Sequence, residues 1–362
     1  MKPVRVLIID DSATMRRIIG FALSSNPAIQ VVGEAPDPTE AFKLVDALDP
    51  DVITLDIEMP KMNGIDFLRR VMKHRPRPVI MVSTLTVNGA AVTIEALALG
   101  AFDCVAKPSL KDDRSFEDLI EKVIAAGAVR ARSSAGMARP IQAREPSAPT
   151  PAPAAPPMSG GALERLIAIG ASTGGVEALI SVLSEFPMDC PPTVITQHMP
   201  ANFTRSFAER LDRLCRPTVQ EAEDRRPLQR GNIYIAPGGG RHMEIVRGGG
   251  GLETRLREGE TVSGHRPSVD VLMNSVAAAA GRDCVGVILT GMGRDGAQGL
   301  LKMRQNGART IGQDETSSLI YGMPRVAFEV GAVQKQLPLS RIAREIFAGA
   351  RSTKEGTVLC HS

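Results

Sequence analysis

The stretch Leu166–Leu179, LIAIGASTGGVEAL, determines how the second half of this chain is interpreted. Its apolar run Leu166–Ile169 has the length of a strand and breaks at Gly170, and a helical pattern follows the glycines. A strand, a glycine-rich turn and a helix together hold a side chain at the carboxyl edge of a parallel sheet. The spacing Gly170-x-Ser172-x-Gly174 matches the sharp turn that exposes a serine hydroxyl to an incoming carbonyl.

Three interpretations of this turn stay open on its residues alone. Ser172 is a nucleophile in the first, and the amides that open the helix then face a developing oxyanion. In the second the turn cradles a phosphate, although it does not have the GxGxxG pattern. In the third it only caps and starts a helix. A general base at the same sheet edge would favour the first interpretation over the other two.

Length and composition indicate a globular protein of two domains. The chain has 362 residues, too many for one ordinary core, with 43% hydrophobic and 23% charged residues. No apolar run reaches the roughly 18 residues of a membrane span, and the N-terminus lacks a signal-peptide layout, so we expect a cytoplasmic protein without membrane insertion. Its 5 cysteines form no CxxC pair, which predicts reduced thiols and no zinc site.

The formal net charge of +3 is unevenly distributed along the chain. Residues 1–128 hold 15 Lys and Arg against 18 Asp and Glu, whereas residues 163–362 hold 24 against 21. The basic second half could favour an acidic partner surface, although such a balance is more often a solvated surface. With no Trp and 2 Tyr, the aromatic platforms of single-strand nucleic-acid binders are missing, and we expect no nucleic-acid partner.

Residues 1–128 alternate apolar strands with helical patterns. The pattern predicts strands at 4–9, 30–34, 51–55, 78–82 and 101–106, and helices near 13–25, 38–48, 64–74, 88–99 and 115–127. Five such units predict an open parallel α/β sheet covered by helices on both faces.

Functional side chains stand at four of the five strand ends of this region, where the chemistry of such sheets collects. They are Asp10, Asp11, Asp56, Ser83 and Lys107. Three crowded acids facing a lysine and a hydroxyl predict a Mg²⁺ site with oxygen ligands and one carboxylate left as nucleophile. Each acid alone could equally cap the following helix.

Four motifs of this region, LIIDDSATMRR, ITLDIEMPKMNGIDFL, VIMVSTLT and AKPSL, closely resemble the receiver domains of two-component response regulators. The resemblance implies a flavodoxin-like fold in which Asp56 is phosphorylated. It also implies that Asp10, Asp11 and Asp56 hold Mg²⁺. Ser83 would sense the phosphoryl group, and Lys107 would form an ion pair with it. Receivers usually carry Tyr or Phe where this chain has Cys104, which puts an aromatic rotamer switch there in doubt.

Residues 129–162 are rich in Pro, Ala and Ser and predict a disordered linker. The second domain is expected over 163–350, with a tail at 351–362. Strands are predicted at 166–169, 193–197, 232–236, 285–290 and 310–313, a β-hairpin at 242–246 and 252–256, and helices at 176–185, 202–214, 268–280, 296–306, 323–330 and 338–349. This pattern indicates a second doubly wound, mostly parallel α/β sheet.

A serine nucleophile needs an imidazole, and His198 ends the strand TVITQHMP at the kind of edge that carries Ser172. His242 and His265 are placed in loops beside arginines, where substrate or surface contacts are equally expected. Asp295, in VGVILTGMGRDGAQGL, reaches the same edge and could orient the His198 ring, or else only cap the next helix.

The order Ser172, His198, Asp295 differs from that of α/β-hydrolases. Together with IGASTGG, TQHMP, HRPSVDVLM, ILTGMGRDGA and YGMP, it resembles the catalytic domain of CheB-type chemotaxis methylesterases. The resemblance implies a nucleophile, a base and an orienting acid in that order, and an oxyanion hole at Thr173 and Met292. It further implies phosphorylation-activated hydrolysis of γ-glutamyl methyl esters on chemoreceptors, deamidation of receptor glutamines, and a CheA-type histidine kinase as phosphodonor.

Two other classes of function fit these residues less well. A nucleotide-binding module would need an acid about 20 residues after the turn, which Glu185 or Asp189 could only loosely supply. It would leave His198 and Asp295 without a role. A DNA-binding response regulator would need a basic recognition helix that the second domain lacks.

Overall fold

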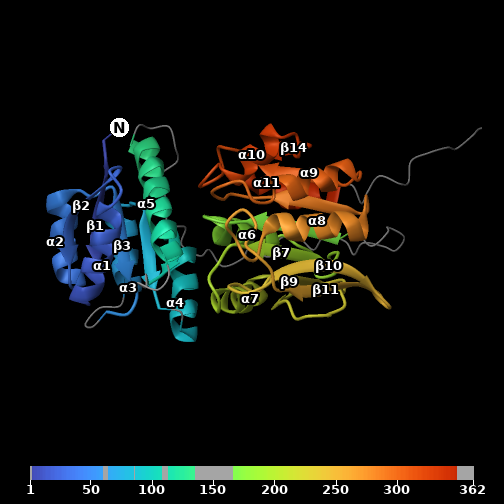
Figure 1. The fold of residues 1–362 in the computed structure, drawn as a ribbon, viewed down its shortest axis with the longest axis horizontal. Coiled ribbons are helices and arrows are strands. Elements are labelled where there is room, and N and C mark those ends of the chain that lie inside the picture. The colour runs from blue at the N-terminus through green and yellow to red at the C-terminus, as the bar shows by residue number, and fades with distance from the viewer. Residues whose placement is uncertain (1, 60–63, 85, 108–112, 135–165, 349–362) are drawn as a thin grey trace, which may run out of the picture.

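The computed structural model describes residues 2–59, 64–84, 86–107, 113–134 and 166–348. They form the two domains expected from the sequence patterns, side by side in Figure 1 with the N-terminal domain on the left. Among the described residues, no helix is both long enough and apolar enough to cross a bilayer.

The N-terminal domain is a parallel sheet in the order β2-β1-β3-β4-β5, with helices on both faces. Its strands are β1 (Val4–Ile9), β2 (Ile29–Ala35), β3 (Val52–Asp56), β4 (Val79–Ser83) and β5 (Asp103–Ala106). Its helices are α1 (Ala13–Ser24), α2 (Pro38–Leu48), α3 (Gly64–His74), α4 (Val87–Ala98) and α5 (Asp113–Ser134). This strand order confirms the flavodoxin-like expectation. Strands β3 and β4 are buried along their whole length, as strands covered on both faces are.

Helix α5 continues beyond its expected end at residue 127. It runs to Ser134 and so takes in residues 129–134, which the expected linker included. Gly127 stands at the expected end but does not stop the helix: it lets α5 pack closely on β1, because a Cβ there would lie 2.5 Å from Val4 Cγ2. The rest of the expected linker and the expected tail at 351–362 lie outside the described residues.

The second domain contains a parallel sheet in the order β14-β13-β12-β6-β7-β9-β8. The strands are β6 (Leu166–Ala171), β7 (Thr193–Gln197), β8 (Thr218–Glu221), β9 (Asn232–Ile235), β12 (Cys284–Ile288), β13 (Arg309–Gln313) and β14 (Lys335–Leu337). The order of connection reverses between β6 and β12, and ligands of such sheets bind beyond the strand ends at this switch point.

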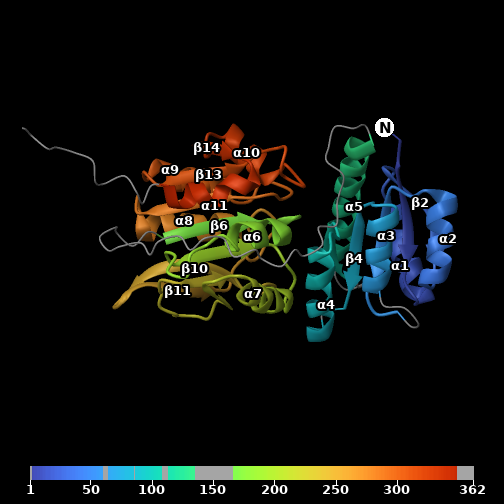
Figure 2. The same cartoon turned by 180° about the vertical axis from the view of Figure 1, so that it is seen from behind.

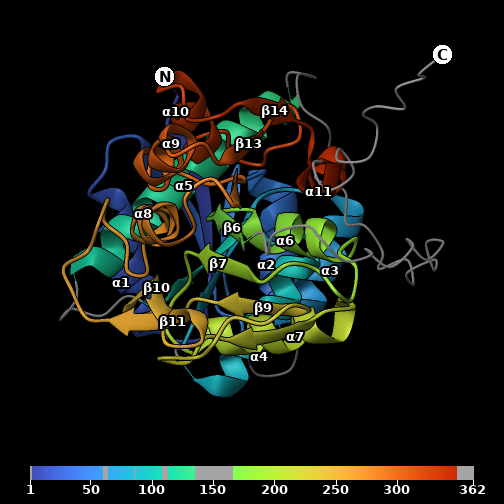
Figure 3. The same ribbon diagram turned by 90° about the vertical axis from the view of Figure 1, so that its right-hand side faces the viewer.

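Helices cover both faces of this sheet, as the end-on view in Figure 3 shows. They are α6 (Gly175–Leu183), α7 (Phe203–Leu214), α8 (Val269–Ala280), α9 (Ala297–Gln305), α10 (Met323–Glu329) and α11 (Leu339–Ala348). The expected hairpin is β10 (His242–Gly248) with β11 (Gly251–Arg257). Helix α8 packs so closely on β6 that a Cβ at Gly170 would overlap the Val269 side chain, so only glycine fits there.

The two domains meet through α4 and α5 of the first and the carboxyl edge of the second sheet (Figure 2). Helix α4 packs against α6 and α7, and the buried apolar core continues across this contact. One hydrogen bond also crosses it, from Thr173 Oγ1 to Asp103 Oδ2 at 2.5 Å. The first domain therefore sits on the edge that carries Ser172.

Candidate active site

Ser172 and His198 leave two neighbouring strands at the same level. Ala171 of β6 and Gln197 of β7 are register partners, and each of the two candidate residues is the next one along its strand. The Ser172 amide donates to Thr290 O at 3.0 Å, and its carbonyl accepts from Gln197 Nε2 at 2.9 Å. Sheet register and these bonds hold the serine at the strand end, and both side chains line one cleft.

His198 is tied to Asp295 through one ring nitrogen. Its Nε2 lies 2.9 Å from Asp295 Oδ2, and because a carboxylate only accepts, Nε2 carries the proton of the neutral ring. Nδ1 then carries the lone pair, is buried, and has no hydrogen-bond partner among the described residues. A free lone pair beside the serine strand is what a general base requires. No hydrogen bond from Ser172 Oγ is formed within the described residues in this arrangement.

Asp295 is fixed by the start of helix α8. Ser268 Oγ donates to its Oδ1 at 2.8 Å, Val269 N to Oδ2 at 2.7 Å and Asp270 N to Oδ1 at 3.0 Å. Burial opposes ionisation, yet the bonds from His198 and from these amides lower the pKa of Asp295 below its usual value. The carboxylate does not cap its own helix, since Gly296, the N-cap of α9, has no side-chain cap bond.

His265 belongs to this site, although the sequence placed it only in a loop with a substrate or surface contact. Its ring stacks on the His198 ring with the centroids 3.7 Å apart and the planes at 15°. Burial, together with the neighbouring His198 charge, lowers the pKa of His265 to about 3. A neutral ring therefore covers one face of His198. The stack joins a loop to a strand end, and no local pattern could have revealed it.

His242 lies in the first strand of the expected hairpin and not in a loop beside Arg241. It is the first residue of β10 and is buried. Its Nε2 lies 2.8 Å from Glu260 O, and Ser268 N donates to its Nδ1 at 3.2 Å. Both nitrogens are used in holding the loop before α8, so His242 supports the fold at this site.

The two positions expected to form an oxyanion hole flank the serine. Thr173 is buried next to it, and Met292 lines the same cleft. The Thr173 carbonyl accepts from Thr290 Oγ1 at 3.0 Å, while its hydroxyl donates across the domain contact to Asp103. In this arrangement the N-terminal domain takes up the Thr173 hydroxyl.

Within the part of the chain that the structure describes, two cavities adjoin Ser172. One, of about 20 Å³, lies between Ser172, His198 and residues of the N-terminal domain, including Phe102 and Asp103. It has room for about one water molecule. The other, of about 590 Å³, opens between α5 and the loops around His265 and Met292. A small group can enter this second cleft, whereas Phe102 and Asp103 of the N-terminal domain close the small cavity on the other side of Ser172.

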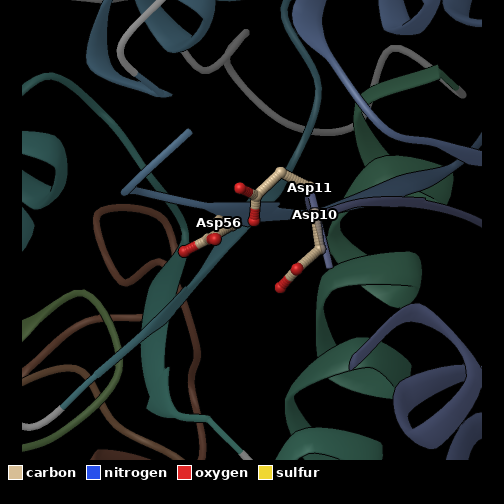
Figure 4. Close-up of side chains that lie close together, drawn as sticks. All are labelled: Asp10, Asp11 and Asp56. Atoms are coloured by element: carbon tan, nitrogen blue, oxygen red, sulfur yellow. The ribbon is translucent and has the colours of Figure 1, made fainter. Parts of the chain in front are cut away.

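Asp10, Asp11 and Asp56 come together at the carboxyl edge of the N-terminal sheet (Figure 4). One ligand atom from each lies within 4.8 Å of the others, as a bound cation would require. Burial, and then the Asp56 charge, raise the pKa of Asp10, and its buried Oδ2 has no hydrogen-bond partner in the described chain. That oxygen has only the Lys107 ammonium 3.3 Å away, and three carboxylates that offer oxygens so close together fit a hard cation such as Mg²⁺.

Lys107 and Ser83 stand at the same edge. Lys107 Nζ donates to Asp56 Oδ2 at 2.7 Å and lies 3.3 Å from Asp10 Oδ2. The Ser83 hydroxyl is buried and donates to Thr84 O at 3.1 Å. Cys104, where receivers usually have an aromatic residue, is buried, which raises its pKa to about 12. Lys122 Nζ donates to the Cys104 carbonyl at 2.8 Å.

Two family models match the two domains. Residues 167–346 match CheB methylesterase, and residues 6–121 match the response regulator receiver domain. A protein of Rhizobium johnstonii named protein-glutamate methylesterase/protein-glutamine glutaminase 1 is 57% identical over 358 residues, which cover 98% of this chain and 99% of that protein. The chain belongs to the CheB methylesterase family.

Other members of the CheB family are similar over the same length or over one domain. A Caulobacter vibrioides protein with the same printed name is 56% identical over 348 residues, covering 96% of this chain and 98% of that protein. The crystal structure of the Thermotoga maritima CheB methylesterase catalytic domain has a TM-score of 0.50 and 34% identity, covering 51% of this chain and 98% of that one. The resemblance stated from the sequence motifs is confirmed.

Proposed function

We propose that this CheB-family chain is a serine carboxylesterase that hydrolyses γ-glutamyl methyl esters of chemoreceptors to glutamate and methanol. It also deamidates glutamines of the same receptors and is activated by phosphorylation of its receiver domain. The observation that carries the proposal is the state of His198. Its Nε2 is tied to Asp295 at 2.9 Å, and its buried Nδ1 is left free beside the strand that carries Ser172.

In the proposed reaction Ser172 Oγ attacks the γ-carbonyl carbon while His198 Nδ1 takes the hydroxyl proton. Asp295, ionised by its hydrogen bonds, stabilises the imidazolium that forms. Collapse of the tetrahedral intermediate breaks the bond to the methoxy group, which leaves as methanol with the proton from His198. Water then attacks the acyl-enzyme, His198 accepts its proton and returns it to Ser172, and glutamate is released. With a glutamine substrate the leaving group is ammonia.

The oxyanion of that intermediate needs donors at the mouth of the turn. Thr173 and the backbone of Met292 are proposed for this role because both flank Ser172 in the cleft. While Asp103 accepts the Thr173 hydroxyl, that donor is unavailable, and a carboxylate lies where negative charge would develop. The docked receiver thus opposes catalysis both by closing one side of the space around Ser172 and by the charge of Asp103.

Phosphorylation is proposed at Asp56, with Mg²⁺ held by Asp10, Asp11 and Asp56. When bound, the ion supplies the positive charge that three crowded carboxylates and a phosphoryl group require. Lys107 pairs with the phosphoryl group and Ser83 senses it, two roles supported by their place at the same edge. Repacking of this edge shifts the population from the docked to the released arrangement.

The partners follow from this scheme. Methyl-accepting chemoreceptors are the substrates, and a CheA-type histidine kinase supplies the phosphoryl group. The cytoplasm is the proposed location, supported by cysteines that are all free among the described residues, as a reducing compartment keeps them. Since α5 takes in residues 129–134, the Pro-rich linker stays a prediction over 135–162 only, and the domain limits of 163–350 stay a prediction as well.

The experiment that tests the function measures methanol release from a peptide carrying γ-methyl glutamate, with acetyl phosphate as phosphodonor. We expect Ser172→Ala to lower turnover by about 10⁶, and Ser172→Ala/His198→Ala to be no slower than the single variant, because a triad acts as one unit. Independent, multiplying effects of the two substitutions would show that these residues do not act together. An Asp56→Asn variant is expected to keep its unstimulated rate and lose stimulation.

A further inference from the structure

The 590 Å³ cleft beside Ser172 has walls of opposite charge. On the catalytic side it is lined by Arg266 and Arg294. On the receiver side α5 lines it with Glu117 and Glu121, together with Asp118, which is paired to Lys122 at 3.2 Å. The two halves of the chain differ in the same way as these two walls, since the net charge is negative before the linker and positive after it.

These charges are not neutralised by neighbours. Arg266 donates through Nη1 to Gly259 O at 2.6 Å, and no carboxylate lies within ion-pair distance of it in the described chain. Arg294 has neither a hydrogen bond nor an ion pair to any described residue. Glu117 and Glu121 likewise form no ion pair with a described residue. Both arginines line the same cleft.

Both arginines are adjacent to the reacting groups. Arg266 directly follows His265, which stacks on the His198 ring. Arg294 directly precedes Asp295, whose Oδ2 holds the His198 ring through Nε2. A peptide with its γ-ester at Ser172 would therefore have its flanking side chains within reach of the two guanidinium groups, which bind carboxylates well.

We propose that Arg266 and Arg294 select an acidic substrate segment by binding carboxylates that flank the reactive glutamyl ester. We further propose that, while the receiver is docked, Glu117 and Glu121 of α5 take the place of the substrate carboxylates opposite the two arginines. This inference rests on the proposed esterase function and adds to it the residues that choose the substrate.

The geometry of α5 indicates the form of the preferred substrate. Glu117 and Glu121 are four residues apart on a helix, so they share one face and are separated by about 6 Å along the axis. A substrate helix that carries carboxylates one turn apart would present the same pattern to the arginines. The receiver helix and the substrate then compete for one site by the same chemistry.

The experiment compares two peptides of equal length, each with one central γ-methyl glutamate. Glutamates flank the ester at positions three and four residues away in one peptide, and glutamines replace them in the other. With the full chain and acetyl phosphate, we expect kcat/KM for methanol release to favour the acidic peptide about tenfold, mainly through KM, as two partly exposed ion pairs would supply. The preference should shrink as salt shortens the Debye length from about 10 Å to about 3 Å.

The arginine variants locate the source of the preference. Arg266→Gln/Arg294→Gln should reduce the ratio of the two kcat/KM values to about one, and Arg266→Lys/Arg294→Lys should keep part of it, because the positive charges remain without the guanidinium geometry. Equal kcat/KM for the two peptides in the wild type, or a ratio that persists in the glutamine variant, would overturn the inference. Neither result touches the esterase function, which fails only if Ser172→Ala still releases methanol.

The receiver half has its own measurement. Glu117→Gln/Glu121→Gln should raise the rate without phosphodonor several-fold, because the docked helix loses its electrostatic attraction to the arginines across the cleft. An exposed carboxylate on the far helix α2 provides the matched control, Asp46→Asn. An unchanged unstimulated rate in the α5 variant, or an equal rise in the control, would refute the competition between α5 and substrate.

Discussion

Substitution of Asp103 tests whether the receiver restrains the serine site through Thr173. The Asp103 carboxylate is 14% exposed and accepts the Thr173 hydroxyl at 2.5 Å. A hydrogen bond to a charged group contributes about 2 kcal/mol, so its loss in Asp103→Ala should shift the docking equilibrium about 30-fold toward release. Lys122 keeps its pair with Asp118, so the substitution leaves no lysine without a partner.

The assay is methanol release from the γ-methyl glutamate peptide without phosphodonor. If the docked form predominates, the rate follows the released fraction and should rise by the same factor of about 30, with a correspondingly smaller stimulation by acetyl phosphate. Asp103→Asn retains an acceptor for Thr173 and should give about a fivefold rise, since it loses only about 1 kcal/mol.

The control is Asp46→Ala, which removes an exposed carboxylate of α2 far from the domain contact and should leave the rate unchanged. A folded Asp103→Ala protein with the unstimulated rate of the wild type would show that this hydrogen bond does not hold the receiver in place. The same conclusion would follow if the unstimulated rates did not decrease in the order Asp103→Ala, Asp103→Asn, wild type.

Three further predictions concern other parts of the molecule. Because His265 has a pKa of about 3 when folded and a reference value of 6.5, the unfolded chain binds the extra proton between these pH values. Stability should therefore fall by up to about 1.4 kcal/mol per pH unit below 6.5, and His265→Gln should remove this slope in urea unfolding at pH 7 and pH 5. Gly170→Ala should destabilise the second domain by about 1–3 kcal/mol in the same assay, through overlap with Val269, and a neutral result would contradict the close packing of α8. Asp10→Asn should abolish phosphorylation by acetyl phosphate at every Mg²⁺ concentration, measured by mass, and full phosphorylation in that variant would exclude Asp10 as a ligand.

The sequence patterns predicted most of the fold because both domains repeat strand, turn and helix. Nearly every strand of the two sheets was expected within a few residues. The exceptions, β8 (Thr218–Glu221) and β14 (Lys335–Leu337), are short edge strands with few buried side chains. Such strands owe their form to a single neighbour, and their own residues have no strand pattern to detect.

The candidate site was predictable where its residues follow strands. Ser172 and His198 each come one residue after a buried strand, so sheet geometry alone brings them together. Contacts between distant loops were not predictable. The stack of His265 on His198 and the bond from Thr173 to Asp103 depend on how loops and whole domains pack, which no local spacing encodes.

The central claim is that one serine carries both proposed reactions. The most direct test follows methanol and ammonia together, from a receptor fragment that carries both γ-methyl glutamate and glutamine, with acetyl phosphate present. We predict that the wild-type chain releases both products and that a folded Ser172→Ala variant releases neither above background. Release of either product at the wild-type rate by Ser172→Ala would contradict the account.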